Sequence, residues 1–324
     1  MKTLFNLSTS VYDLDRFASR EELLSLIDEL GFDGVELLAC DDDPRGIVPV
    51  ERVAGQHMIY FPYWVDFYRG DEQALLREFG SLEECERVYG GTDKRALIER
   101  FRADFRLAEH YGAEYVVFHV SDAGIAEAMS GRYRHTSAEV IDATCDLLGE
   151  VLSGMTYRPQ LLLENLWQPG LTFTEPEMTR RLLEGVPYES VGIMLDTGHL
   201  FHTNEGIRTQ EEGLGYILAM LDRHGALAER IRGVHLHQSI TGESARQMRL
   251  HPPALGEAYE ARAWQMFEYA FQIDLHRPFT CKGVRELIDR IAPDYLTYEF
   301  VTNSTAQHKA FLLEQKSALR KQNR

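Results

Sequence analysis

The chain has 324 residues, enough for one large barrel or two small domains, and 44% of them are hydrophobic, so it can bury a sizeable core. Its formal net charge of -17 at pH 7 repels polyphosphate, which makes nucleic acid an unlikely general partner. The cysteines form no CxxC pair, the first residues do not resemble a signal peptide, and no stretch approaches the roughly 18 apolar residues of a membrane span, so we expect a cytoplasmic protein with reduced thiols.

Short apolar, β-rich runs alternate along the whole chain with longer amphipathic runs. In chain order, strands are expected at 4–8, 34–38, 55–61, 115–120, 160–166, 191–196, 233–237 and 295–300. The spacing of apolar residues predicts helices at 19–30, 93–111, 137–152, 175–183 and 284–291. Eight strand–helix pairs favour a closed (β/α)₈ TIM barrel, with residues 1–324 as a single domain. An open doubly wound sheet is the alternative, weakened because no GxGxxG follows the first strand.

Two connections are long, at 62–92 after the third strand and at 239–273 after the seventh. Both follow the C-terminal end of a strand, where barrel enzymes build their sites. The start of the first connection gathers aromatic side chains, namely Phe61, Tyr63, Trp64, Phe67 and Tyr68. Two interpretations of this cluster are open. It forms a satellite core or the contact of a homodimer, or it forms an aromatic wall over a large ligand.

Ligand-type side chains stand at or near the C-terminal ends of six consecutive expected strands. From the third strand to the eighth they are His57, His119, Glu164, Asp196 with His199, His235 with His237, and Glu299. Taken singly, each has an ordinary explanation as a satisfied core histidine or a helix cap. Together they would place several buried charges at one barrel mouth, and burial of those charges costs free energy unless a cation neutralises them. Imidazole and carboxylate are the ligands of zinc, manganese or iron, so the sequence predicts a metal site.

These residues resemble the pattern of the xylose isomerase-like barrels, also called AP endonuclease family 2. The resemblance extends from GFDGVEL on the second strand to YEF on the eighth. Its most specific motifs are Glu-Asn at the end of the fifth strand and Asp-Thr-x-His at the end of the sixth. The superfamily contains sugar isomerases and epimerases as well as the endonuclease IV phosphodiesterases, so the resemblance implies a metal-dependent barrel enzyme.

The two branches of the superfamily hold different numbers of metal ions. For the one-metal epimerase branch, the resemblance implies the ligands Glu164, Asp196, His235 and Glu299. For the endonuclease IV branch, it adds His57, His119, His199, Asp274 and His276. Asp274 and His276, in IDLHRPF, could instead form a capped turn between helices. His251 in MRLHPP is the other candidate for this ligand position, but it has no acid nearby.

The first reaction that the resemblance implies is phosphodiester hydrolysis with two or three Zn²⁺ ions, of which Glu164 would bridge two. The endonuclease pattern has Asn-Asp shortly after the histidine of the seventh strand, whereas His237 and Gln238 follow here, which argues against DNA as the substrate. A large phosphorylated small molecule then fits better. In this respect the chain is similar to the cobamide-remodelling phosphodiesterases, which cleave the nucleotide loop of a corrinoid.

The second reaction is isomerisation or epimerisation of a sugar or sugar phosphate with one Mn²⁺ or Mg²⁺ ion. Glu164 and Glu299 would move a proton between the two faces of an enediolate, and His199 and His237 would hold substrate hydroxyls. A metal-binding barrel without catalysis is a third class, which loss of an essential ligand would indicate. None of the four ligands that both branches share is missing.

Overall fold

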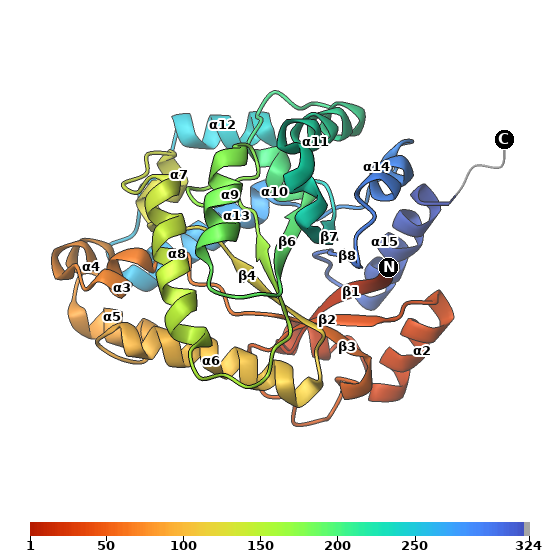
Figure 1. The fold of residues 1–324 in the computed structure, drawn as a ribbon, viewed down its shortest axis with the longest axis horizontal. Coiled ribbons are helices and arrows are strands. Elements are labelled where there is room, and N and C mark those ends of the chain that lie inside the picture. The colour runs from red at the N-terminus through yellow and green to blue at the C-terminus, as the bar shows by residue number, and fades with distance from the viewer. Residues whose placement is uncertain (321–324) are drawn as a thin grey trace.

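The computed structural model, which describes residues 1–320, contains a closed barrel of parallel strands in the order β1 to β8. The strands are β1 (Lys2–Ser8), β2 (Gly34–Leu38), β3 (Val53–His57), β4 (Tyr115–His119), β5 (Gln160–Glu164), β6 (Val191–Asp196), β7 (Ile231–Leu236) and β8 (Tyr295–Tyr298). Pairing of β1 with β8 closes the sheet, so the TIM barrel is confirmed and the open sheet is excluded. Figure 1 shows the strands at the centre of the molecule with helices around them.

Amphipathic helices connect most of the strands and cover the outside of the barrel. They are α2 (Arg20–Leu30), α6 (Lys94–Tyr111), α8 (Ser137–Leu152), α9 (Pro176–Gly185), α11 (Gln210–His224), α14 (Val284–Ile291) and α15 (Thr305–Ala318). The expected helices 137–152 and 284–291 match α8 and α14. Ser19 and Asp93 lie just outside α2 and α6 as their N-cap residues, which explains a one-residue difference at each start.

Further helices lie in the loops, including those at the C-terminal ends of the strands. They are α1 (Val11–Leu14), α3 (Val65–Arg69), α4 (Glu72–Phe79), α5 (Leu82–Tyr89), α7 (Ile125–Ser130), α10 (Thr197–His202), α12 (Gly242–Leu250) and α13 (Tyr259–Ile273), with 3₁₀ turns η1 (Val50–Arg52) and η2 (Gly225–Arg230). Helices α7, α12 and α13 contact one another around a small core of their own, and we call these three helices the cap. Figure 1 shows α7 and α12 at the upper edge of the molecule.

Three expected strands extend too far by two or more residues at their C-terminal ends, namely 55–61, 160–166 and 295–300. In each case the backbone leaves the barrel ladder within one residue of the polar residue at the rim. The amide of Ile59 donates to the carboxylate of Asp104 on α6 at 3.1 Å, and the amide of Phe300 donates to Asn6 Oδ1 at 2.9 Å. After β3 and β8, a side chain thus replaces the backbone of the neighbouring strand as hydrogen-bond partner. The other strand boundaries differ by at most two residues.

The connection between β2 and β3 contains no α-helix, contrary to the expectation of eight strand–helix pairs. Residues 39–52 cross the barrel surface with only the 3₁₀ turn η1. This segment holds three successive aspartates, two prolines and a glycine, which disfavour a continuous helix.

The aromatic cluster at 61–68 packs into the chain's own main core. Tyr63, Trp64 and Phe67 are buried, and the rings of Phe67 and Tyr89 stack at 3.8 Å. These three side chains are therefore core residues, but they belong to the main core and not to a satellite of it, and the aromatic wall is wrong for them. Burial also removes them from the contact of a homodimer.

The inside of the barrel below its C-terminal mouth is filled by apolar side chains. Leu4, Ala54, Tyr115, Val117, Leu162 and Met194 form this interior cluster. The polar residues at the strand ends therefore have an apolar floor beneath them. Across residues 1–320, no helix is both long and apolar enough to cross a membrane, and all four cysteines are free thiols.

Candidate metal centre

The polar side chains that end β3 to β8 converge at the mouth of the barrel. Parallel pairing sets some of them directly side by side, because His119 is the register partner of Glu164 and Asp196 is the partner of His235. The side chains of Glu164, Asp196 and His235 are fully buried. The strand register therefore delivers these residues to one level, as the sequence predicts.

The first group is formed by His57, His119 and Glu164. Both Nε2 atoms point at the same carboxylate oxygen, since Glu164 Oε2 lies 3.3 Å from His57 Nε2 and 3.1 Å from His119 Nε2. The two Nε2 atoms are themselves 3.0 Å apart. His57 donates from Nδ1 to the carbonyl of Met58 at 2.8 Å, which leaves its Nε2 lone pair directed into the group.

The second group uses the other oxygen of Glu164. His235 Nδ1 lies 3.3 Å from Glu164 Oε1, 3.2 Å from Glu299 Oε2 and 3.8 Å from Asp196 Oδ2. On its far side, His235 donates from Nε2 to Glu36 Oε1 at 2.8 Å. This bond fixes the ring so that the Nδ1 lone pair faces the carboxylates, an arrangement typical of metal-binding histidines.

Glu164 is the residue on which a fit to metal ions can be judged. Within residues 1–320, neither of its buried carboxylate oxygens accepts a hydrogen bond of normal geometry, although imidazole nitrogens surround both. Burial alone would raise its pKa, but the charges of His119 and His235 outweigh burial and hold that pKa well below the usual range. The buried carboxylate thus needs positive charge beside it, and divalent cations held by the imidazole nitrogens would supply that charge in place of protons, so the donor set fits metal ions.

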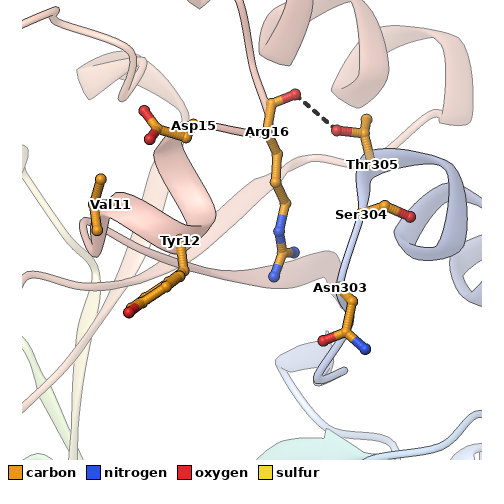
Figure 2. A pocket seen from close by; sticks show the side chains of 7 residues that line it. All are labelled: Val11, Tyr12, Asp15, Arg16, Asn303, Ser304 and Thr305. Atoms are coloured by element: carbon orange, nitrogen blue, oxygen red, sulfur yellow. Dashed lines mark hydrogen bonds between the residues drawn. The ribbon is translucent and has the colours of Figure 1, made fainter.

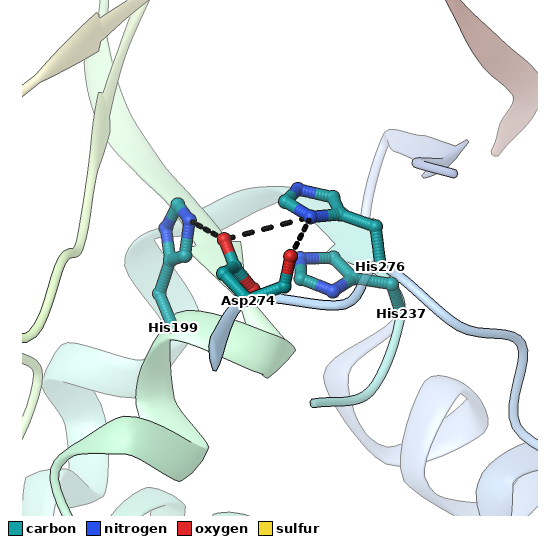
Figure 3. Close-up of side chains that lie close together, drawn as sticks. All are labelled: His199, His237, Asp274 and His276. Carbon is teal, nitrogen blue, oxygen red and sulfur yellow. Dashed lines mark hydrogen bonds and ion pairs between the residues drawn. The ribbon is translucent and has the colours of Figure 1, made fainter. Parts of the chain in front are cut away.

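A third group lies beside the first two and is shown in Figure 3, where His199, Asp274, His276 and His237 surround a common space. His199 Nε2 lies 3.2 Å from Asp274 Oδ2, and His276 Nδ1 lies 3.5 Å from the same oxygen. His199 donates from Nδ1 to the carbonyl of Asn165 at 3.0 Å, so its Nε2 lone pair is free to face Asp274. Asp274 ends α13 as its C-cap, so the capped turn and the cluster occur together.

His237 belongs to the third group and also to a fourth, which it forms with Asp196 and Glu299. Its Nε2 donates to Asp196 Oδ2 at 2.8 Å, and its ring stacks on that of His276 at 3.9 Å. From its position in the sequence we expected His237 only to hold substrate. One of its imidazole nitrogens also lies among the metal-binding atoms of the third group. His251, the competitor of the Asp274 pair, is exposed at the end of α12 and belongs to none of the clusters found.

Two residues around the site are not predicted from the sequence. Glu36 on β2 is buried and orients His235. His202 on α10 places Nε2 3.5 Å from Asp274 Oδ1. The available signal for Glu36 was a lone carboxylate in the otherwise apolar run GVELL. His202 follows His199 by three residues, so the two lie on one side of their helix turn.

Burial sets the protonation of two further members of the site. It raises the pKa of Glu299 to about 7, although the neighbouring His235 lowers it. It lowers the pKa of His276 to about 4, against the opposing charge of Asp274. An imidazole that stays neutral near pH 7 is in the form that binds a metal ion.

A separate hollow of about 430 Å³ lies where α1 faces the start of α15 (Figure 2). The hydroxyl of Thr305 donates to the carbonyl of Arg16 there. The guanidinium of Arg16 pairs with Asp13 at 2.7 Å and donates to Thr302, so it is not a free cation for an anionic ligand. None of the ligand groups contributes to the lining of this hollow.

Comparison with known proteins gives one family match and several similar folds. The xylose isomerase-like TIM barrel family matches residues 24–281. Endonuclease IV from Thermus thermophilus is similar at 18% identity and a TM-score of 0.53, over 98% of this chain and 99% of that chain. The IolI protein with a bound zinc atom is similar at 14% identity and a TM-score of 0.50, over 98% and 96%. No curated protein sequence matches the chain. At such identities the structural likeness shows the fold alone.

Proposed function

The chain belongs to the xylose isomerase-like TIM barrel family, and on that basis we propose that it is a metal-dependent phosphodiesterase acting on a small molecule. The observation that carries this proposal is the third group, His199, Asp274 and His276, beside the two groups that share Glu164. An isomerase of this family requires one ion and four ligands, which leaves the third group without a role. Three adjoining groups of ligands suit phosphoryl transfer, where charge on several oxygens must be neutralised together.

Three sets of residues would hold the ions, which we propose to be zinc. His57, His119 and Glu164 would hold the first, Glu164, Asp196, His235 and Glu299 the second, and His199, Asp274 and His276 the third. Ions of this kind supply a water of lowered pKa and stabilise charge on phosphoryl oxygens.

The surrounding residues keep the ligands in place. Glu36 holds His235 through Nε2, the carbonyl of Met58 holds His57, and the carbonyl of Asn165 holds His199. With three imidazole rings fixed by acceptors behind them, the site is preorganised and loses little freedom on binding ions and substrate.

A small phosphorylated molecule is a better substrate than DNA for this chain. The net charge of -17 opposes the approach of a polyanion. His237 and Gln238 stand where the endonuclease pattern has Asn-Asp. The backbone amide of Gln238 donates to the backbone carbonyl of Arg277. Both features support a substrate with few phosphate groups.

The alternative is a metal-dependent isomerase or epimerase of a sugar or sugar phosphate. One observation favours it, since Glu164 and Glu299 both lie within 3.3 Å of His235 Nδ1 while the pKa of Glu299 is raised to about 7. A pair of glutamates with such different proton affinities can exchange a proton with a substrate near neutral pH. A single Mn²⁺ or Mg²⁺ ion would serve this reaction.

Metal stoichiometry of protein purified without chelator separates the two proposals. Elemental analysis that finds two to three zinc-type ions per chain would support the phosphodiesterase. One manganese- or magnesium-type ion per chain would favour the isomerase and contradict the proposal of three filled groups.

The variant Asp274→Asn tests the third group directly. An amide oxygen is a weaker ligand than a carboxylate, so we expect one ion fewer per chain and a turnover of bis(4-nitrophenyl) phosphate lower by about 10- to 100-fold. The matched control is His251→Asn, at an exposed position in the same long connection. If Asp274→Asn keeps both its metal content and its rate, the third group has no part in the reaction.

A further inference from the structure

An apolar slot of about 80 Å³ lies beside the candidate metal centre, between the cap and the loops that follow β3 and β5. None of its lining residues belongs to the three ligand groups. Its walls include Tyr60, Ala128, Trp167, Met266, Phe267 and Ala270. The slot is therefore a separate feature that adjoins the site.

Two aromatic residues connect the slot to the ligand groups. The ring of Tyr60 packs on the imidazole of His119, with centroids 4.6 Å apart. The ring of Trp167 lies 5.2 Å from that of His199 and 4.7 Å from that of His202. One wall thus touches the first group and another touches the third. A phosphoester bound between these groups would therefore lie next to the slot.

The lining defines the chemistry of an occupant. Among residues 1–320, no charged side chain lines the slot, so an ionic substituent would lose its hydration without a counter-charge. Gln168 is the one amide in the lining, 8% exposed, and its buried Oε1 accepts no hydrogen bond from residues 1–320. An apolar group, with at most one donor directed at Gln168, satisfies this lining.

The size of the slot limits how much of the occupant it encloses. An enclosed cavity of about 150 Å³ holds a benzene molecule, so a slot of about 80 Å³ takes the edge of a ring or a branched alkyl group. Phe267 lines the slot and is 44% exposed, and Trp264 and Phe271 on the same helix are 64% and 59% exposed. The remainder of a larger apolar group can therefore rest on Phe267.

We propose that this slot binds an apolar substituent of the phosphodiester that the metal centre cleaves. The substrate class is then a phosphodiester with a charged reacting centre and one aryl or branched alkyl ester group. This inference rests on the proposed phosphodiesterase function and adds the feature that selects among its substrates.

The test compares two phosphodiesters with the same 4-nitrophenyl leaving group, one with a phenyl and one with a methyl ester, on the metal-loaded enzyme. The measured quantity is the ratio of kcat/KM for the phenyl ester to that for the methyl ester. Ala270→Leu fills the slot and Phe267→Ala removes its outer wall. We expect each to lower the ratio about tenfold, because that factor corresponds to the burial of roughly two methylene groups.

The matched control is Ala261→Leu, which adds the same atoms at an exposed position of α13 and should keep the ratio within about twofold of wild type. Phe267→Ala changes a partly exposed side chain, so it tests the slot even if Ala270→Leu does not fold. An unchanged ratio in folded variants, with both esters cleaved, overturns the slot and leaves the phosphodiesterase standing.

Binding of phenylphosphonate and methylphosphonate, measured by calorimetry, tests the slot without turnover. If neither diester is cleaved, the proposed function fails. The slot is then supported if phenylphosphonate binds about tenfold more tightly than methylphosphonate and Phe267→Ala removes the difference. Equal affinities of the wild-type protein for the two phosphonates overturn it.

Discussion

Glu36 is a buried carboxylate that bonds to a proposed ligand without being one. Its Oε1 accepts from His235 Nε2 at 2.8 Å, and its Oε2 accepts from the hydroxyls of Tyr115 at 2.5 Å and Thr297 at 3.0 Å. Burial would raise its pKa, but the charge of His235 and these bonds lower it, so Glu36 stays ionised. A charged acceptor behind an imidazole increases the basicity of the nitrogen on the opposite side of the ring.

We therefore expect Glu36→Gln to weaken zinc binding at the group that contains His235 by about 10- to 100-fold, because the amide is a poorer acceptor and the ring loses its fixed orientation. Competition with a chromogenic chelator measures the dissociation constants. The control is Glu51→Gln, which removes an exposed carboxylate paired with Arg20. Equal zinc affinities of Glu36→Gln and wild type would show that His235 needs no such support.

The ligand-type residues could be predicted because a simple rule places them, since polar residues at the ends of parallel barrel strands meet at one mouth. Glu36 obeys no such rule, because it lies within β2 and its partner His235 is 199 residues away. His237 was recognised as polar, but its stacking on His276 depends on the path of the long connection after β7. Contacts of that kind depend on loop geometry that residue patterns do not encode.

Among the elements, α10 is the one that most closely shapes the site. It begins directly after β6, with Asp196 as its N-cap, and Asp196 Oδ1 accepts from the amide of His199 at 2.6 Å. The helix runs so close to the end of β7 that a Cβ atom on Gly198 would lie 2.0 Å from Cε1 of His237. Glycine is required at this approach because there is no room for a methyl group.

Gly198→Ala should therefore displace the ring of His237 and break its bond to Asp196. We expect activity to fall by at least about tenfold and the free energy of unfolding to fall by about 1–3 kcal/mol, as in other overpacked sites. Kinetic assay and urea unfolding measure the two effects.

The control is Gly215→Ala in α11, where a Cβ atom meets nothing within 4 Å. That substitution should raise the free energy of unfolding by up to about 1 kcal/mol, since alanine is the better helix former. If the two alanine variants behave alike, close packing of α10 on β7 is not what the site requires.

The ends of helices and strands were predicted correctly where local sequence signals agree. They were predicted wrongly where apolar residues continue past the end of a barrel strand. Ser137 and Leu152 bound α8 as expected, because Thr136 and Glu139 form a capping box at its start. The strand expected at 160–166 ends at Glu164, because the amide of Leu166 donates to the carbonyl of Leu171 in the following loop. Leu166 lines the apolar slot, so this apolar residue serves the slot and not the barrel strand.

For the whole molecule, α15 packs its buried His308 against β1, where the barrel closes. The imidazole lies 5.3 Å from the ring of Phe5. Burial lowers the pKa of His308 to about 4, and Arg16 contributes to that lowering. The folded protein thus holds this histidine neutral at a pH where an unfolded chain, with a histidine pKa of about 6.5, already binds a proton.

Because the unfolded state binds the proton first, the free energy of unfolding should fall as the pH drops from about 6.5 to about 4, by about 3 kcal/mol from His308 alone. His308→Leu lacks this loss, so its free energy of unfolding should rise relative to that of wild type by about 3 kcal/mol as the pH falls over the same range. Urea unfolding at several pH values measures it, with the exposed His251→Leu as control. Parallel pH curves for wild type and His308→Leu would contradict the assignment.

At this scale the sequence contained most of the architecture. Alternation of strands and helices predicted the closed barrel, although residues 39–52 cross without a helix. The two long connections were recognised by their length, but where they pack was not predicted. One supplies part of the main core, and the other forms two helices of the cap. A single domain over residues 1–324 stays a prediction.

The cap carries a consequence for motion. Its buried core, with Ile125, Ala245 and Tyr269 among its members, shares no buried residue with the main core around the barrel. Segments with few contacts to the rest of a protein open locally at a lower free energy than global unfolding requires. Amide hydrogens of α12 and α13 should then exchange with solvent faster than those of the barrel strands. A cap that opens locally would give substrate entry a barrier separate from that of global unfolding.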